Sequence, residues 1–206
     1  MPDMSADQPD LFGMALPIAC PVEGLRLQAG VVTADEEAAI IARIDAAGLE
    51  PFKFQGWLGK RLTASFGSAY DYTRGAVMPA PPMPDWLLPL RARLARWAGL
   101  APERLKQALV IRYDPGAGIG WHRDRPQYGT VIGVSLGAAE TMRLRRRRDE
   151  GGFERFALPL RPREAYLLDG PARTEWEHSI APVESARWSV TFRTLRDQPP
   201  TVSSGQ

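Results

Sequence analysis

The stretch from Val110 to Asp124, VIRYDPGAGIGWHRD, constrains the fold more than any other part of the chain. It is typical of a strand, a turn rich in proline and glycine, and a second extended piece that ends at His122-Arg123-Asp124. In extended chain, residues i and i+2 point to the same side. His122 and Asp124 are therefore expected to lie side by side, as two ligands of a metal ion would.

A third ligand is expected far away in the sequence. The chain has only two histidines, and the other is His178. Two histidines and one carboxylate, with open coordination positions, form the facial arrangement that non-haem Fe(II) oxygenases use. A turn-capping Asp124 and a satisfied core His178 are the alternatives for the individual residues.

Nine residues after His178 begins a segment with arginine at both ends, RWSVTFR. In a strand, its polar side chains share one face and its apolar side chains share the other. The polar set is Arg187, Ser189, Thr191 and Arg193, and the apolar set is Trp188, Val190 and Phe192. The polar face either meets water or lines an interior, where the guanidinium groups could bind a carboxylate in a fork.

His-x-Asp, a distal histidine about fifty residues later and the paired-arginine strand together resemble the AlkB-like Fe(II)/2-oxoglutarate dioxygenases. The resemblance covers roughly residues 52–195. It implies that His122, Asp124 and His178 bind Fe(II), with 2-oxoglutarate as co-substrate and O₂ as oxidant. It also selects the interior reading of the arginine strand.

The resemblance assigns co-substrate contacts as well. Arg187 would pair with the far carboxylate of 2-oxoglutarate. Arg193 would pair with the carboxylate next to the metal, or act on the substrate side. Tyr113 matches a family tyrosine that hydrogen-bonds 2-oxoglutarate. The family often has asparagine where Ile111 and Ser189 stand here, so fewer hydrogen bonds and weaker binding of the co-substrate are expected.

The implied reaction is oxidative demethylation of an alkylated base. 2-Oxoglutarate becomes succinate and CO₂, and the methyl group leaves as formaldehyde from a base that is extruded into the pocket. Some DNA-repair relatives place an acid within two residues of the His-x-Asp motif. Here those residues are Arg125 and Pro126, so a preference for 1-methyladenine and 3-methylcytosine is less strongly indicated than the reaction type.

The segment FQGWLGKRLTASFGSAYDY mixes aromatic rings, cations and glycines. Aromatic rings stack on unpaired bases and cations contact phosphates. In the AlkB-like family the segment ahead of the core forms a nucleotide-recognition lid, expected here at about 54–75. The alternative is a plain hairpin with half-buried aromatics. The candidate substrate contacts, which include two from outside this segment, are Lys60, Arg61, Phe66, Tyr70, Arg125 and Trp176. A core position is the alternative for Trp176.

A dense cationic run, RLRRRR, spans 143–148. In a strand, Arg143, Arg145 and Arg147 face one way while Arg146 and Arg148 face the other. Two interpretations remain open. The run either follows a nucleic-acid backbone or is a solvated edge strand that charge keeps from aggregating.

The order of elements predicts a mainly β, α+β fold, a double-stranded β-helix or jelly roll with helices on one face. After a strand at Leu25–Val32, a capping box at Thr33 and Glu36 starts a helix that ends near Gly48. Asp85 is expected to cap a second helix, which Gly99 ends. The later strands are expected at Gln107–Tyr113, Gly129–Leu136, Thr141–Arg148, Phe153–Leu160, Glu164–Leu168 and Trp188–Leu195.

With 206 residues the chain is expected to form one domain, 16–196, between flexible tails at 1–15 and 197–206. One cysteine indicates a reducing compartment. No signal peptide or membrane span is visible. A cytoplasmic monomer is therefore expected, with single-stranded DNA or RNA, including tRNA, as its partner. The net charge of +2 does not by itself indicate nucleic-acid binding.

Two other functions compete with base demethylation. The same chemistry could act on a protein or a small molecule, because this fold supports many substrates. A non-catalytic jelly-roll binding module is the third hypothesis, and it predicts no metal-dependent release of succinate.

Overall fold

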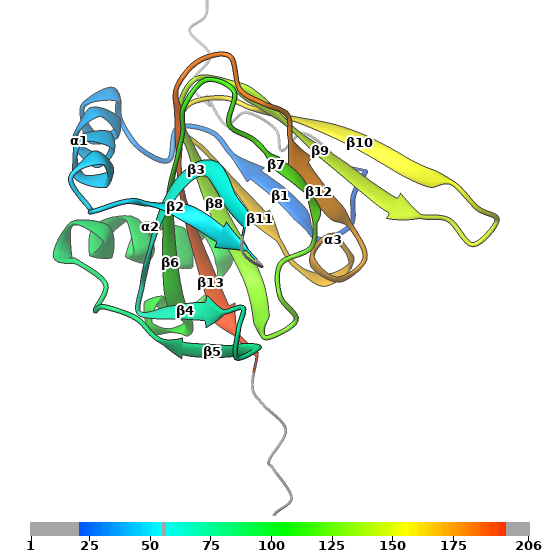
Figure 1. The fold of residues 1–206 in the computed structure, drawn as a ribbon, viewed down its shortest axis with the longest axis horizontal. Helices are drawn as coiled ribbons and strands as arrows, with labels where there is room; N and C mark the ends of the chain where they lie inside the picture. Colours follow the sequence, from blue (N-terminus) through cyan, green and yellow to red (C-terminus); the bar gives the residue numbers. More distant parts are fainter. Residues whose placement is uncertain (1–20, 55–56, 197–206) are drawn as a thin grey trace, which may run out of the picture.

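Two antiparallel β-sheets face each other in the structure, a computed structural model that describes residues 21–54 and 57–196 (Figure 1). The expected tails, 1–15 and 197–206, and positions 55–56 of the expected lid lie outside the described residues. Helices α1 and α2 cover one face of the larger sheet. This arrangement is the double-stranded β-helix that the sequence predicted.

The larger sheet has seven strands in the order β1-β11-β8-β13-β6-β3-β2. Their bounds are β1 (Leu25–Gln28), β11 (Glu164–Leu168), β8 (Tyr128–Gly137), β13 (Arg187–Leu195), β6 (Leu105–Tyr113), β3 (Trp57–Phe66) and β2 (Glu50–Phe54). The smaller sheet has the order β10-β9-β12-β7. Its strands are β10 (Phe153–Leu160), β9 (Glu140–Arg147), β12 (Glu177–Ile180) and β7 (Ile119–His122). A separate hairpin joins β4 (Ser68–Asp71) to β5 (Ala76–Pro79).

Two hydrophobic clusters hold these layers together. One lies between the helices and the larger sheet, and it includes Ile44 of α1, Leu94 of α2 and Phe192 of β13. The other lies between the two sheets, with Tyr166 on β11 and Leu144 on β9 among its members. The alternation along β13 divides it between these surroundings, because its apolar side chains pack toward the helices and its polar ones turn toward the smaller sheet.

Helix α1 (Ala34–Asp45) begins as the sequence predicted. The Thr33 hydroxyl accepts a hydrogen bond from the Glu36 backbone N–H, and the Glu36 carboxylate accepts one from the Thr33 N–H. This reciprocal capping box satisfies two backbone donors that a helix otherwise leaves free. Glu36 also pairs with Arg93, so the cap is tied to α2 (Leu88–Ala98).

The predicted cap at Asp85 is wrong. Asp85 opens a short 3₁₀ turn, η1 (Asp85–Leu87), and makes no side-chain cap; α2 follows it and has Leu87 at its N-cap. The end of α2 is confirmed, since Gly99 adopts φ 75°, which costs glycine least. The sequence did not predict η1, β12, η2 (Pro102–Arg104) or α3 (Gly170–Thr174).

The six later strands are confirmed within two residues at each end, and β10 and β11 have the predicted bounds. The first strand is shorter than expected and ends at Gln28, because Gly30 turns the chain with φ 63° so that Val31 and Val32 enter the core beside the helices. Within the described ranges, no helix has the length and apolar character that crossing a membrane requires.

Candidate metal and co-substrate site

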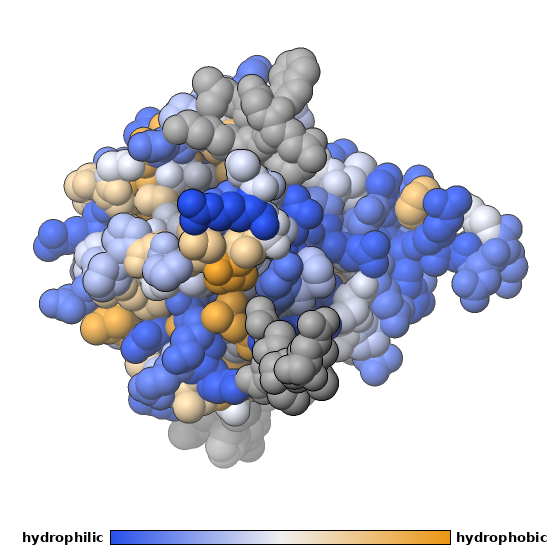
Figure 2. Space-filling view, turned by 60° about the horizontal axis from the view of Figure 1, so that its bottom comes forward, coloured by the Kyte–Doolittle hydropathy of each residue, from blue (hydrophilic) through white to orange (hydrophobic). Residues whose placement is uncertain are grey.

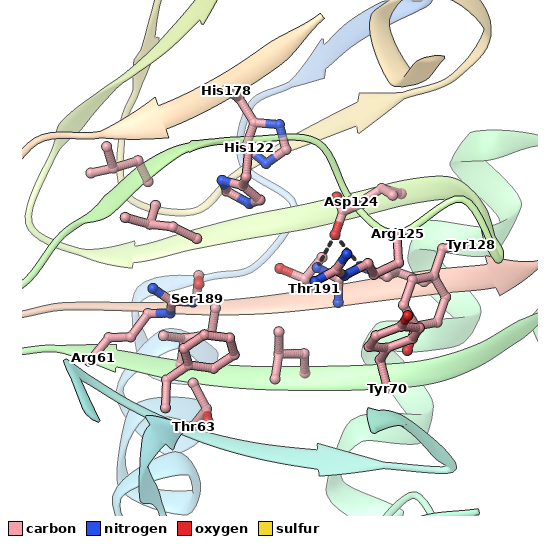
Figure 3. A pocket seen from close by; sticks show the side chains of 18 of the residues that line it. Arg61, Thr63, Tyr70, His122, Asp124, Arg125, Tyr128, His178, Ser189 and Thr191 are labelled. Atoms are coloured by element: carbon pink, nitrogen blue, oxygen red, sulfur yellow. Dashed lines mark hydrogen bonds and ion pairs between the residues drawn. The ribbon is translucent and has the colours of Figure 1, made fainter. Parts of the chain in front are cut away.

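A cavity of about 600 Å³ opens between the two sheets. Figure 3 shows side chains of both sheets pointing into it, with His122 and His178 above the polar side chains of the strands below. Ten of the residues singled out from the sequence line it: Arg61, Tyr70, Tyr113, His122, Asp124, Arg125, His178, Arg187, Ser189 and Arg193. Residues that are far apart in the sequence, from Arg61 to Arg193, therefore line one cavity.

The two histidines are brought together by strand pairing. β7 and β12 are antiparallel neighbours, and His122 and His178 are direct partners in their register. Their ring centroids lie 4.2 Å apart. In the tautomer that carries the proton on Nδ1, His122 donates to the Gly120 carbonyl oxygen 2.9 Å away. The lone pair of Nε2 then remains for a metal.

Burial keeps both imidazoles neutral. It lowers the pKa of His178 to about 3, and the neighbouring His122 lowers this pKa further. Burial also lowers the pKa of His122 below its ordinary value. Neutral imidazole is the form that coordinates a metal, so neither ring has to lose a proton at neutral pH.

Asp124 is held by Arg193. Nε and Nη2 of Arg193 lie 2.9 and 2.7 Å from the same carboxylate oxygen, Oδ1, and only 9% of each side chain is exposed. Burial alone would raise the pKa of the Asp124 carboxyl, but nearby positive charge, that of Arg193 above all, outweighs it, so the pKa is lowered and the group is ionised. Figure 3 draws these bonds as dashed lines from Asp124.

The donor set fits a divalent metal in its chemistry, although the three side chains do not yet form a closed cluster. Across the described part of the chain, no three His, Cys, Asp or Glu side chains converge closely enough to hold an ion. The carboxylate of Asp124 is bound to Arg193 through Oδ1. Because Arg193 uses only Oδ1, the other oxygen, Oδ2, could bind a metal while the ion pair persists. His122, His178 and Asp124 would then hold the ion.

Arg187 is the clearest sign of an anion site. Its side chain is 1% exposed, Nε donates to the Ser135 hydroxyl at 3.2 Å, and Nη1 has no hydrogen-bond partner among the described residues. A buried guanidinium without a carboxylate is costly unless an anion binds it. Tyr113 lies beside it, with its ring centroid 5.1 Å from the guanidinium carbon. This pair fits the far carboxylate of 2-oxoglutarate.

Arg193 differs from the expectation that it offers a free fork to the co-substrate. Besides binding Asp124, it donates to the Gln107 side-chain oxygen at 3.0 Å and lies over the ring of Tyr128. Burial raises the pKa of Tyr128 to about 12, so this phenol stays protonated. Arg193 therefore orients Asp124 and is a positioning residue in this structure.

Aromatic rings and guanidinium groups alternate at the mouth of the cavity. Tyr72 makes edge-on contacts with Tyr70 and Phe52, with centroid distances of 5.0 and 5.7 Å. Arg61 lies 3.8 Å from the Phe52 ring centroid, and Arg125 lies 4.9 and 4.7 Å from those of Tyr70 and Tyr72. We call these five residues the aromatic rim.

The structure does not bring three expected substrate contacts to the cavity. Phe66 packs against the cluster beneath the helices, and Trp176 is 3% exposed within the cluster between the sheets. Both aromatic rings pack in hydrophobic clusters and do not line the cavity, contrary to their expected role as substrate contacts. Lys60 is exposed and lies near Gly116, outside the cavity lining.

Several cavity residues were missed in the sequence. Phe52, Trp121, Tyr128 and Tyr166 all line it. The phenol of Tyr166 projects over Gly133, where a Cβ would lie 2.2 Å from the ring. A glycine facing a tyrosine across paired strands could not be recognised before the register of β8 and β11 was known. Trp121 had one available signal, its position next to His122.

A family model for the 2OG-Fe(II) oxygenase superfamily matches residues 30–196 of the chain. An alpha-ketoglutarate-dependent dioxygenase alkB homolog 3 from Rattus norvegicus is 28% identical over 155 residues, 68% of this chain and 51% of that protein. An uncharacterised Acanthamoeba polyphaga mimivirus protein, L905, is 30% identical over 102 residues, 43% of this chain and 48% of the viral protein. The chain spans about half the length of these curated relatives.

Solved structures resemble the fold. The structure of OsALKBH1 aligns with a TM-score of 0.66 and 16% identity, covering 83% of this chain and 96% of that one. A Pseudomonas putida prolyl-4-hydroxylase aligns with a TM-score of 0.58 and 17% identity, covering 85% and 94%. The family match covers most of the chain and agrees with the cavity described above. The chain therefore belongs to the 2OG-Fe(II) oxygenase superfamily, and this membership implies Fe(II), 2-oxoglutarate and O₂ as its cofactor and co-substrates.

Proposed function

We propose that the protein oxidatively demethylates alkylated bases in DNA or RNA, as in the repair of alkylation damage. His122, Asp124 and His178 hold the iron, and Arg187 and Tyr113 hold the far carboxylate of 2-oxoglutarate. Ser189 lies two residues along the same polar face of β13 and contributes to the co-substrate floor. Bound iron and 2-oxoglutarate supply the oxidising power.

The observation that carries the proposal is the aromatic rim. Unpaired bases are commonly bound by stacking on aromatic rings or on the planar guanidinium of arginine, and the rim offers both at the mouth of a cavity large enough for a base. Tyr72 is 37% exposed, so part of this side chain can contact a ligand. The likeness to alkB homolog 3 supports the same reading.

The protein's own side chains position the reactants. Arg193 fixes the carboxylate of Asp124 through Oδ1, and the Gly120 carbonyl orients the ring of His122. Burial around the histidines lowers the pKa of both rings and keeps the imidazoles unprotonated. The rim holds the base above them, as extrusion from the strand requires.

Arg125 affects which base is accepted. It stands where an acid would accept a hydrogen bond from an exocyclic amine, and a guanidinium can only donate hydrogen bonds. Bases with a carbonyl oxygen at that edge would therefore be favoured over adenine. The substrate panel must include N-methylated thymine, uracil and guanine beside 1-methyladenine and 3-methylcytosine.

The test is mass spectrometry of methylated trinucleotides incubated with the protein, Fe(II), ascorbate and 2-oxoglutarate, with succinate and formaldehyde measured in parallel. Loss of one methyl group, abolished in His122→Ala, would support the proposal. Matched deoxyribose and ribose trinucleotides compare DNA with RNA. Succinate release without any change in the panel of bases would refute base demethylation and direct the search to proteins and small molecules.

A further inference from the structure

The outer face of the smaller sheet combines cations and aromatic rings outside the cavity. Register and burial show which side chains share it. In β9, Met142 and Leu144 are buried toward the larger sheet, so the alternate positions face outward. We define the outer sheet face by the seven residues Trp121, Arg143, Arg145, Arg147, Phe153, Arg155 and Glu177.

Rings and guanidinium groups stack in a row across this face. The Arg145 guanidinium lies 4.3 Å from the Trp121 ring centroid on one side and 4.5 Å from that of Phe153 on the other. Arg155 lies 5.5 Å from the Phe153 centroid. Glu177 fixes Arg145 through a bond of 2.6 Å to Nε. The row is therefore preorganised, and Trp121 and Phe153 within it are partly exposed.

Charge is distributed unequally between the two faces of the β9–β10 hairpin. The outer sheet face carries four arginines and one glutamate, a surplus of three positive charges. On the opposite face, Arg146 is neutralised by Glu154 and Glu175, at 2.8 and 2.9 Å. Two further acids, Asp149 and Glu150, lie in the turn at the tip. β9 lies between β10 and β12, so the interpretation of the run as an edge strand protected by charge is wrong.

The row begins beside the active cavity. Trp121 lines that cavity and directly precedes His122. From β7 the sheet runs through β12 and β9 to β10, three strand spacings or roughly 15 Å. The hairpin extends beyond the body of the protein, and Figure 2 shows it as a largely hydrophilic arm. A strand with one base in the cavity would reach this surface by passing β7, the edge strand of the smaller sheet that carries Trp121.

We propose that the outer sheet face binds the single-stranded nucleic acid that flanks the target base, with phosphates on Arg147, Arg155 and Arg143 and a neighbouring base stacked on the row. This inference rests on the proposed function, because it takes the substrate to be a polynucleotide. It assigns the arginine run a binding role at Arg143 and Arg147 and a structural role at Arg145 and Arg146. DNA and RNA share the chemistry that this surface recognises.

The experiment measures binding of a fluorescein-labelled, unmethylated 12-nucleotide strand, as DNA and as RNA of the same sequence, by anisotropy from 50 to 400 mM salt. The test variant is Arg147→Ala/Arg155→Ala. The matched control is Arg43→Ala/Arg96→Ala, which removes the same charge from exposed positions in the last turns of α1 and α2. Melting temperatures establish that each variant is folded.

Each phosphate contact adds about 0.7 to the slope of log affinity against log salt for single strands, so losing two contacts lowers the slope by about 1.4. At 0.1 M salt this corresponds to about 25-fold weaker binding. The proposal predicts this loss for the test variant and wild-type binding for the control. Equal weakening of both variants would show an effect of net charge only, and an unaffected test variant would exclude the surface. Either result overturns the inference.

Turnover of a methylated trinucleotide by the wild-type protein separates this inference from the proposed function, because such a short strand extends little beyond the cavity. Demethylation of the trinucleotide without the predicted change in 12-nucleotide binding would leave the proposed function intact and overturn the inference. Binding through Arg147 and Arg155 without demethylation of any base would support the surface and refute the repair activity. A stronger effect with DNA or with RNA identifies the natural strand.

Discussion

Replacing Arg187 with methionine should make the protein more stable and less able to bind 2-oxoglutarate. The guanidinium is 1% exposed and has no carboxylate partner among the described residues, with Nη1 unbonded. Without co-substrate, the folded protein therefore bears the cost of a buried cation. Replacing buried charged groups by apolar ones of similar volume stabilises proteins by about 1–4 kcal/mol in favourable cases.

The expected size of the effect follows from the length of the chain. For 150–250 residues, 1 kcal/mol shifts the melting temperature by about 2–4 °C. Arg187→Met should therefore raise it by at least about 2 °C in EDTA without 2-oxoglutarate. Wild type with Mn(II) and 2-oxoglutarate at 100 times its dissociation constant gains about 2.7 kcal/mol. Losing about 2 kcal/mol of charge-assisted binding weakens affinity about 30-fold and reduces that gain to below about 1 kcal/mol.

Arg193→Met is the matched control, because it makes the same substitution at the other end of the same strand face. Arg193 pairs with Asp124, and both side chains are 9% exposed. Removing one partner of a buried pair leaves an uncompensated charge and costs about 3–5 kcal/mol. The two variants should therefore shift the melting temperature in opposite directions. A fall for Arg187→Met comparable to that for Arg193→Met, or a full 2-oxoglutarate response in Arg187→Met, would refute the reasoning.

Three further predictions concern the N-terminal cap of α1, the contact between Gly133 and Tyr166, and the aromatic rim. Glu36→Gln should lower the free energy of unfolding by about 1 kcal/mol. This is less than the lowering of the Glu36 pKa from 4.5 to about 2 implies, because the Glu36–Arg93 pair is about 40% exposed. Between these two pH values, Glu36 in the folded protein binds fewer protons than Glu36 in the unfolded chain. The wild type should therefore lose stability as the pH falls from 4.5 to 2. Urea melts at pH 5 and pH 3 should show a smaller loss of stability in the variant. Gly133→Ala would place a methyl group against Tyr166 and should lower the free energy of unfolding by about 1–3 kcal/mol, whereas Gly120→Ala, which meets open space, should change it little in the same urea melts. Arg125→Ala removes the cation stacked on Tyr70 and Tyr72 and should raise KM for the methylated trinucleotide about 2- to 30-fold. The control is Arg74→Ala, which removes an exposed arginine from the β4–β5 hairpin.

The periodic parts of the fold could be predicted from the sequence because local pattern and tertiary burial agree there. The alternation in RWSVTFR gave the correct faces of β13, since the helices demand apolar side chains on one face and the cavity accepts polar ones on the other. The capping box at Thr33 and Glu36 is equally local. Asp85 does not cap α2 because a 3₁₀ turn precedes this helix, and the residue types at these positions do not predict such a turn.

The candidate metal ligands were predicted from the sequence and remain a prediction, whereas their partners in the structure were not predicted. That His122 faces His178 follows from the register of β7 with β12. The pairing of Asp124 with Arg193 depends on the loop after β7 and on the far end of β13, which lie 69 positions apart in sequence. No pattern of period two or 3.6 contains this information. Phe66 and Trp176 were misjudged for the same reason, because an aromatic residue serves a rim or a core according to the layer it meets.

The two arginines that mark β13 therefore have different electrostatic environments, although the sequence presents them as a symmetric pair. Arg193 is compensated within the protein and fixes a metal ligand. Arg187 has no carboxylate partner in the described part of the chain and can bind an anion. A site with both arginines paired would have little affinity for a dicarboxylate, and one with neither paired would carry two buried cations and be unstable. With Arg193 paired and Arg187 left for an anion, the protein can be stable without 2-oxoglutarate and still bind a carboxylate in the cavity.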